Sequence, residues 1–291
     1  MSSVMIVGPG KMGLALGHAL LQEEAVRELT VCGRRPEPPA HPIFTQGMAR
    51  YVFGLEAPSA GTRAVFLAVP EGAVPEVAHA LGAQGPAPEG AAAFHLSGWM
   101  GTGVLEPLHA AGYAVGAFHP LQVVAHPVTA AQRLPGSYIA VTGSPAAFSV
   151  ARNLADAMGA RTLEVPETWK TKYHAATVMA ADMIPALLDA ACRILERAGV
   201  HHEDALPALL PLVSGVLANI SESGIERALA GPIPDADLET ISLHLRALDD
   251  DDRRLYATIG REVARLSASE HSNTSLHALI ERFDAELGAL T

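Results

Sequence analysis

The segment Met5-Ile6-Val7-Gly8-Pro9-Gly10-Lys11-Met12-Gly13 joins an apolar strand to a G-x-G-x-x-G turn, and residues 15–21 continue with the spacing of a helix. In such a turn the first two glycines allow a tight bend and a close approach to a pyrophosphate, and the third lets helix and strand pack closely. The helix N-terminus adds free N–H groups and the positive end of the helix dipole. We therefore predict a dinucleotide-binding turn, rather than a glycine-rich turn without a ligand, with contacts from Gly8, Pro9, Gly10, Lys11, Met12 and Gly13.

The residues after the next apolar run, 29–32, indicate which dinucleotide binds. In NAD-binding proteins an acid about 20 residues past the glycines bonds to the ribose 2′-hydroxyl, whereas an arginine accommodates a 2′-phosphate. Here Arg34 and Arg35 follow the strand, and no acid lies between Thr30 and Pro36. A guanidinium group can hold a phosphate through two hydrogen bonds. The sequence predicts NADP as the cofactor; the alternative is that both arginines lie on a solvated loop.

Length and composition predict a two-domain protein of the cytoplasm. A chain of 291 residues exceeds what one core usually supports. The net charge of −11 argues against a nucleic-acid partner, because phosphates need a basic face. Two cysteines, Cys32 and Cys192, make no disulfide framework, and no signal peptide precedes the first strand.

Long apolar stretches are interrupted by polar residues, which argues against a membrane span. Residues 175–195, for example, contain Asp182, Pro185, Asp189 and Arg193. We predict a buried helix there and no membrane partner.

Short apolar strands alternate with helices over the first half of the chain, which is typical of a doubly wound, mostly parallel Rossmann sheet. Candidate strands are residues 4–7, 29–32, 64–69, 91–96, 114–118, 138–141 and 161–165, with a further short one at 50–53. Helical periodicity then replaces the strands at 169–198, 203–223, 236–248, 252–267 and 273–290. The predicted fold is α/β, with a cofactor domain at 1–165 and an all-α domain at 166–291.

Polar side chains follow several of the predicted strands, where ligands of open α/β sheets bind. Val69 and Pro70 end one strand, Ser97 follows the next, and His119 follows the one after. We expect Val69, Pro70 and Ser97 to border the nicotinamide, with Ser97 and His119 in the active site. The alternative for Ser97 is a helix or turn cap.

The helical half begins with a run of charged and aromatic residues before an apolar helix. On one continuous helix, His174 and Asp182 would lie roughly 80° apart around the axis, so both can face one cleft. A buried aspartate needs a partner, which makes a role in the site or a salt bridge the favoured interpretation of Asp182. Both residues can instead be structural polar groups on a helix.

Several of these motifs together resemble a known family. The matching stretches are Gly8–Gly13, His95–Gly98, Phe118–Gln122, Tyr173–Ala176 and Ala230–Ile233. Over nearly its whole length the chain resembles bacterial NADP oxidoreductases that join a Rossmann-like domain to a helical domain of unknown function. The wider superfamily includes ketopantoate reductases, pyrroline-5-carboxylate reductases and β-hydroxyacid dehydrogenases. The resemblance implies hydride transfer from NADPH to a small carbonyl or imine, and a dimer formed through the helical domain.

The chain departs from the family pattern at two positions. Asp182 stands where we expect asparagine, and Asp235 stands where the family usually has arginine. A cation that could hold a substrate carboxylate is missing there, so either the substrate differs or another cation replaces it. The resemblance implies a lysine at the start of the helix that polarises the carbonyl, for which Lys170 and Lys172 are the candidates, Lys172 being favoured; the alternative is an exposed pair.

Other classes of chemistry find no support in the sequence. The run His201-His202-Glu203 lacks metal-ligand spacing, so no metal site is expected. Ser97 lacks the G-x-S-x-G surroundings of a nucleophile.

The predicted function is therefore that of an NADPH-dependent reductase of a small oxo acid or cyclic imine, with His174 as proton donor, assisted by Lys172 or Asp182. The alternative is a sensor or scaffold that binds NADP without turnover. Residues 206–220 are apolar nearly all round, which predicts a homodimer.

Overall fold

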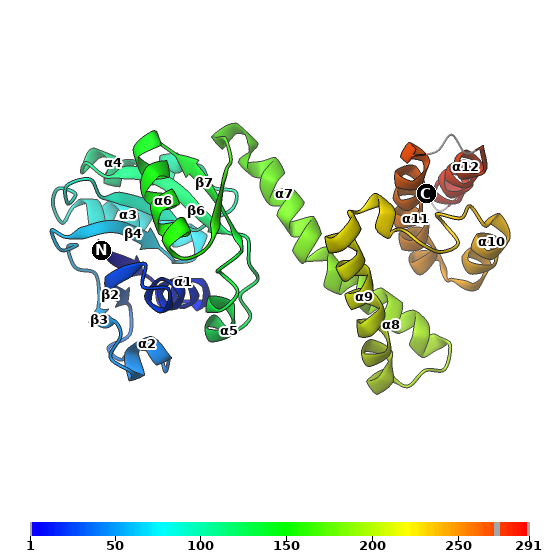
Figure 1. Ribbon diagram of the computed structural model, residues 1–291, viewed down its shortest axis with the longest axis horizontal. Coiled ribbons are helices and arrows are strands. Elements are labelled where there is room, and N and C mark those ends of the chain that lie inside the picture. The colour runs from blue at the N-terminus through cyan, green and yellow to red at the C-terminus, as the bar shows by residue number, and fades with distance from the viewer. Residues whose placement is uncertain (1, 271–273, 290–291) are drawn as a thin grey trace. The chain divides into compact units, whose positions relative to one another are not determined.

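The computed structural model describes residues 2–270 and 274–289. The chain divides into two compact units, Met1–Ala181 and Asp182–Thr291, here called the first and second unit (Figure 1). The first unit extends beyond the boundary predicted near residue 166, because it includes a further helix, Lys170–Ala181, whose first turn is hydrogen-bonded to Ser97 and His119. Each unit has a core of its own.

The first unit is built on one sheet of eight strands in the order β3-β2-β1-β4-β5-β6-β7-β8. Neighbouring strands run parallel except β6 and β7, which are antiparallel. This confirms the predicted α/β class with a mostly parallel sheet, and all the predicted strands are present. The strands are β1 (Ser2–Val7), β2 (Val26–Gly33), β3 (Arg50–Phe53), β4 (Thr62–Leu67), β5 (Ala92–His95), β6 (Ala114–Pro120), β7 (Tyr138–Gly143) and β8 (Arg161–Glu164).

Helices cover both faces of this sheet (Figure 1). One buried cluster lies between the sheet and α1, α5 and α6 and is centred on Phe66, Phe94 and Phe118. A second cluster, with Leu81 and Leu105, lies on the opposite face under α3 and α4. The helices and short 3-10 turns are α1 (Lys11–Gln22), α2 (Pro42–Thr45), η1 (Glu71–Ala73), α3 (Val74–Gly82), η2 (Thr102–Leu105), α4 (Glu106–Ala110), α5 (Pro127–Ala131), α6 (Pro145–Ala157), η3 (Glu167–Trp169) and α7 (Lys170–Ala181).

The second unit is entirely helical in the part that the structure describes, as predicted. Its elements are α8 (Met183–Arg197), α9 (His202–Ser223), η4 (Glu226–Ala228), α10 (Leu238–Ala247), α11 (Asp250–Glu270) and α12 (Thr274–Ala289). The single helix predicted over 169–198 is wrong: the chain forms α7 and α8, with a break at Asp182. Pro185 explains the break, because it has no N–H to donate to the carbonyl of Ala181 and its ring would clash with that group.

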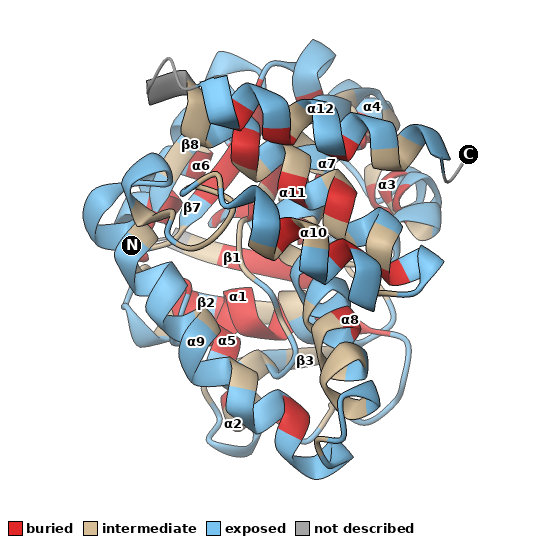
Figure 2. Ribbon diagram, turned by 90° about the vertical axis from the view of Figure 1, so that its right-hand side faces the viewer, coloured by how far each residue is buried: buried red, intermediate tan, exposed pale blue. Residues whose placement is uncertain are grey.

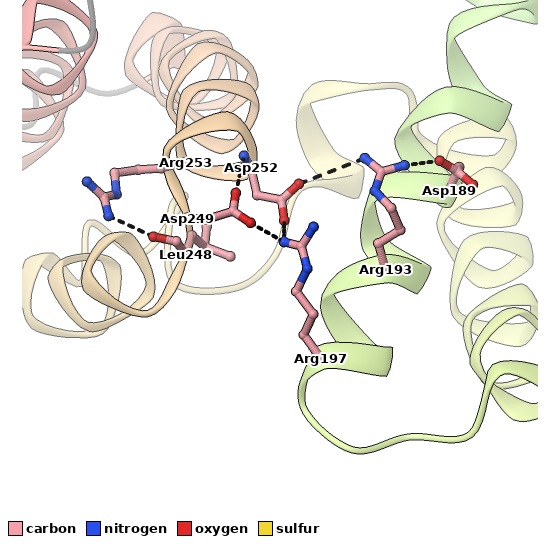
Figure 3. Close-up of polar contacts among 7 residues, drawn as sticks. All are labelled: Asp189, Arg193, Arg197, Leu248, Asp249, Asp252 and Arg253. Carbon is pink, nitrogen blue, oxygen red and sulfur yellow. Dashed lines mark hydrogen bonds and ion pairs between the residues drawn. The ribbon is translucent and has the colours of Figure 1, made fainter.

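Two different kinds of contact hold the second unit together. The helices α10, α11 and α12 bury a small apolar cluster around Leu245 and Phe283. By contrast, α8 is joined to the start of α11 by ion pairs, in which Arg193 and Arg197 both reach the buried carboxylate of Asp252 (Figure 3). The acidic run at the start of α11 therefore does more than favour the helix dipole.

Helices α8 and α9 pack side by side but bury little of their apolar surface. Ala190 is the one buried residue of α8 and Ala205 that of α9, and α9 is largely pale blue in Figure 2. The expectation of a buried helix over 175–195 is therefore wrong. Among the described residues, α9 alone is long and apolar enough to cross a membrane by length and composition, although it contains Pro207 and Pro211.

Candidate functional site

The glycine turn after β1 is crowded at its first and third glycines. At Gly8, φ is +109°, and an added Cβ would lie 2.4 Å from the main-chain oxygen of Ala68. An added Cβ at Gly13 would lie 2.4 Å from the main-chain oxygen of Gly8. Gly10 precedes α1 and has no side chain to cap it, so the first N–H groups of the helix are open to an anion. The turn therefore fits the pyrophosphate of a dinucleotide. The remaining predicted contacts, Pro9, Lys11 and Met12, lie in the same turn and at the start of α1.

The two arginines predicted to bind the 2′-phosphate follow the end of β2. Both Arg34 and Arg35 are exposed. The hydroxyl group of Tyr51, on β3, donates to the main-chain oxygen of Arg35 at 2.6 Å and fixes the backbone there. The nearby Arg50 is paired with Glu56 and serves the structure instead. Two exposed guanidinium groups next to the turn can meet a phosphate.

Polar groups gather where β4 and β5, which are parallel neighbours, reach their carboxyl ends. Val69 and Pro70 follow β4 and lead into Glu71. The Ser97 hydroxyl, beyond the end of β5, donates to the Glu71 carboxylate. The same carboxylate accepts from Trp99 Nε1 at 2.8 Å. Ser97 therefore lies at the predicted edge, and its bond to an acid from the neighbouring loop goes beyond capping a turn.

Lys170, at the start of α7, is the buried cation of this region. Its residue surface is 3% exposed, and Nζ donates to the main-chain oxygen of Ser97 at 3.3 Å. Burial lowers the pKa of Lys170 to about 8, although the carboxylate of Glu167 acts in the opposite direction. Lys172, the favoured candidate, is exposed and its ammonium group lies 4.8 Å from the ring centre of Trp169. Of the two lysines, Lys170 is the one that contacts the site.

His119 and His174 come together on either side of Gly98. Their ring centres are 6.2 Å apart. A Cβ on Gly98 would lie 2.5 Å from Cδ2 of His174 and 3.1 Å from Cε1 of His119, so glycine is needed there. His119 Nδ1 is 2.6 Å from the hydroxyl oxygen of Tyr173. Burial, with the nearby Lys170 and His174, lowers the pKa of His119 to about 4, so its imidazole is neutral at pH 7.

Two further residues hold the loop that carries Ser97. His95 is buried, accepts from the Ser97 N–H at Nδ1 over 3.2 Å, and donates from Nε2 to the main-chain oxygen of Gly101 over 3.2 Å. Burial and Lys170 lower its pKa to about 4. The Glu167 carboxylate accepts from the N–H and from the hydroxyl group of Thr102, each at 2.8 Å. The loop is therefore bonded to both β5 and η3.

The other predicted site residues lie in the second unit. Asp182 is exposed, so the expectation of a buried acid that needs a partner is wrong. Asp235 is also exposed. Because α7 ends before Asp182, this residue does not share a continuous helix with His174. Within the described residues, no three His, Cys, Asp or Glu side chains are placed to hold a metal ion.

Sequence reasoning missed four residues of this region. Glu71 and Tyr173 form side-chain hydrogen bonds with the predicted Ser97 and His119. Trp99 donates to Glu71, and Glu167 accepts from Thr102. Each lies within two or three positions of a residue that was singled out, so the signal was proximity in the chain. Their roles depend on contacts between segments far apart in sequence, which no local pattern predicts.

Two family models match the chain. Residues 1–120 match the model described as a Rossmann-like domain, and residues 137–263 match a domain of unknown function, DUF2520. No curated protein matches the sequence.

Several solved structures have a similar fold. A protein from Thermotoga maritima has a TM-score of 0.72 and 19% identity, with 92% of this chain and 99% of that chain covered. A candidate NADP oxidoreductase from Bacteroides fragilis has a TM-score of 0.66 and 20% identity, covering 90% of this chain and 97% of the other. A pyrroline-5-carboxylate reductase from Coxiella burnetii has a TM-score of 0.62 and 14% identity, with 98% of each chain covered. At these identities the likeness shows the fold.

Proposed function

We propose that this chain, which consists of a Rossmann-like domain followed by a DUF2520 domain, is an NADPH-dependent oxidoreductase that reduces a small carbonyl compound or an imine. The observation that carries the proposal is the buried amino group of Lys170, bonded to Ser97 at the edge where the glycine turn also lies. Solved structures of this fold include an oxidoreductase named for NADP and a pyrroline-5-carboxylate reductase, which supports the class.

The residues of the first unit suit NADPH in three places. The turn from Gly8 to Gly13 would hold the pyrophosphate, because a Cβ at either end would collide with the backbone or fill the cradle. Arg34 and Arg35 would hold the 2′-phosphate. Val69, Pro70 and Ser97 would border the nicotinamide, since they follow β4 and β5. When bound, the dinucleotide supplies hydride.

Lys170 is proposed as the proton donor. A carbonyl oxygen or imine nitrogen must gain a proton when its carbon accepts hydride, and a general acid works best with a pKa near the working pH. Burial brings the pKa of Lys170 to about 8, which meets this requirement. His119, with a pKa of about 4, stays neutral at pH 7 and can orient a substrate by hydrogen bonding.

His174 remains the rival donor. It lies against His119 and Gly98, and it was favoured by the sequence. The Ser97 hydroxyl group, already bonded to Glu71, is proposed to contact the substrate. Lys172 is not retained as a donor, because its ammonium group stacks on Trp169 in solvent.

The test is the oxidation of NADPH in the presence of a panel of small oxo acids, ketones and cyclic imines. Turnover of any member, with NADPH bound more tightly than NADH, is the expected result. Tight binding of NADPH with no turnover of any member would favour the alternative, a sensor or scaffold that only binds the cofactor. Asp182 and Asp235 are the reason to test this alternative, because both depart from the family pattern given by the sequence analysis.

We also propose that two copies associate through α8 and α9. Both helices leave large apolar side chains exposed, among them Leu187, Leu212 and Leu217. Apolar surface of this kind marks contact sites when it is contiguous, and closed twofold dimers are the most common assembly of identical chains.

A further inference from the structure

The Glu71 carboxylate lies at the end of β4, where the proposed function places the nicotinamide and the substrate. It accepts from the Ser97 hydroxyl and from Trp99 Nε1, the latter at 2.8 Å. Glu71 and Trp99 are both exposed, so a small molecule from solvent can reach this carboxylate. An acid is thus held by two donors at the point where a substrate would enter.

The hydrogen bonds of Ser97 leave it little to offer an acidic substrate. Its oxygen already accepts from the N–H groups of Trp99, at 3.4 Å, and Met100, at 3.2 Å. Its one proton goes to Glu71. A substrate carboxylate at Ser97 or at Trp99 Nε1 would therefore have to displace the Glu71 carboxylate.

The other charged groups nearby lie deeper than this acid. After burial itself, the charge of Lys170 has a larger effect than that of Glu71 on the pKa of His95 and of His119. The ammonium group of Lys170 is itself buried and donates to a main-chain oxygen, however, whereas Glu71 is exposed, so a ligand from solvent meets the carboxylate first. His95 and His119 are neutral at pH 7, since the pKa of each is lowered to about 4. Glu167 adds a second negative charge near Lys170. A positively charged group would be attracted here and an anion repelled.

From this arrangement we infer that Glu71 determines the charge of the substrate: the site selects an imine without a carboxylate, whose nitrogen becomes cationic when it is protonated in the site, and it disfavours oxo acids. This inference rests on the proposed function and names the substrate class within it.

Reduction of the imine consumes one proton and one hydride. Lys170 Nζ gives a proton to the imine nitrogen, which forms a cationic C=N–H group beside the Glu71 carboxylate. Hydride from NADPH then adds to the carbon, the π electrons of the C=N bond become a lone pair on nitrogen, and an amine and NADP⁺ result. The Lys170 amine regains its proton from water.

The test compares two five-membered rings of opposite charge as ligands of the protein with NADP⁺, by calorimetry at pH 7.5. Protonated pyrrolidine resembles the amine product, and cyclopentanecarboxylate resembles an acid substrate. We expect the wild-type protein to bind pyrrolidine at least about tenfold more tightly, and Glu71→Gln to reduce this ratio by about tenfold or more. Glu76→Gln, which removes an exposed acid in the first turn of α3, is the matched control and should leave the ratio unchanged.

Trp99→Phe provides a second variant, because it removes one of the two donors that hold Glu71 while keeping an exposed ring. It should reduce the ratio by less than Glu71→Gln does, and it decides the question if Glu71→Gln does not fold. The inference is overturned if the wild-type protein prefers cyclopentanecarboxylate, binds neither ring, or keeps its ratio in both variants. Failure to bind NADP⁺ would instead count against the proposed function, and the two rings would then be compared on the protein alone.

Discussion

The two units of the chain bury their apolar residues in different ways. In the first unit, helices cover both faces of the sheet, and Phe66, Phe94 and Phe118 are fully buried. In the second unit only α10, α11 and α12 enclose a core, while Leu212 on α9 is 66% exposed. Both units are rich in apolar residues, so composition alone does not decide burial. Burial depends on the surface that packs against a helix. Within the described part of the second unit, α8 and α9 pack on each other, α9 also contacts η4, and α8 forms ion pairs with α11.

The proposed catalytic group gives the largest expected effect and tests whether the first unit carries the chemistry. Lys170→Met should lower turnover by about 100-fold to 10,000-fold, because general acid catalysis contributes about that much. NADPH affinity should hardly change, since the ammonium group contacts Ser97 and not the glycine turn. Steady-state kinetics at saturating NADPH measures both quantities.

Lys172→Met is the matched control, because Lys172 lies on the same turn of the helix but is exposed. The turnover of this variant should stay near the wild-type value. The variants His174→Ala and His119→Ala should be measured in the same assay. If His174→Ala loses as much turnover as predicted for Lys170 while Lys170→Met is nearly normal, the proton donor is His174.

Substitution of exposed leucines on α9 should have the next largest effect, which is on the mass of the assembly. Leu212→Glu together with Leu217→Glu should convert a dimer into a monomer, because central apolar residues of interfaces contribute about 2 to 4 kcal/mol each. Light scattering should find about twice 30.4 kDa for the wild-type chain and 30.4 kDa for the variant. Leu163→Glu, at an exposed apolar residue of the first unit, should leave the mass of the wild-type assembly unchanged. A wild-type monomer at micromolar concentration would refute the proposed dimer.

Acid should affect the first unit more than the second. Burial lowers the pKa of His95 from 6.5 to about 4 and acts in the same direction on His119. Below pH 6.5 the unfolded chain binds more protons than the folded chain, so the free energy of unfolding falls as the pH falls towards 4. For fully buried His95 the loss amounts to about 3 kcal/mol.

Both tryptophans, Trp99 and Trp169, lie in the first unit, so their fluorescence reports its unfolding. Urea titrations at pH 7 and pH 4.5 should show a lower midpoint at the acid pH, which His95→Gln should partly remove. Equal midpoints at the two pH values would mean that these histidines are not held in the neutral form.

The sequence predicted the first unit well because its signals are local. The alternation of apolar strands and helices predicted the sheet, and the three glycines predicted the turn. Backbone crowding requires glycine at Gly8 and Gly13. The helices of the second unit were also predicted, but the break at Asp182 was missed, although Pro185 is a signal for a helix break. Burial was misjudged there because periodicity indicates an apolar face without saying what covers it.

The site was predicted only in part for a related reason. Ser97 and His119 follow strands, and parallel strands bring their ends together, so their region could be predicted. Choosing between Lys170 and Lys172 required the helix to be placed in space: two residues along a helix is a turn of about 200°, which separates a buried amino group from an exposed one. Glu71 could not be assigned a role, because its partners Ser97 and Trp99 lie in the loop after the next strand, β5.

The next largest expected effect is a loss of NADPH affinity, which tests whether residues of the first unit bind the 2′-phosphate. Arg34→Ala should cost about 1.5 to 3 kcal/mol of NADPH binding, the range for hydrogen bonds to charged groups. NADH, which lacks the 2′-phosphate, serves as the internal control, and its affinity should barely move. Fluorescence titration with both cofactors measures the difference. Equal losses for NADPH and NADH would remove Arg34 from the phosphate site.

The smallest expected effect concerns the ion pairs that tie α8 to α11 in the second unit. Asp252 is buried and accepts from Arg197, with Arg193 at 3.9 Å, whereas both arginines are about half exposed (Figure 3). Asp252→Asn keeps the shape but removes the charge, and the exposed arginines can turn to water. The expected loss is therefore about 1 to 2 kcal/mol, below the value for a fully buried pair. Thermal melts by far-UV circular dichroism measure it, with exposed Asp251→Asn as the control. If tryptophan fluorescence from the first unit shifts by as much as the helical signal, the two units do not unfold separately, and the contrast between their cores does not extend to their stability.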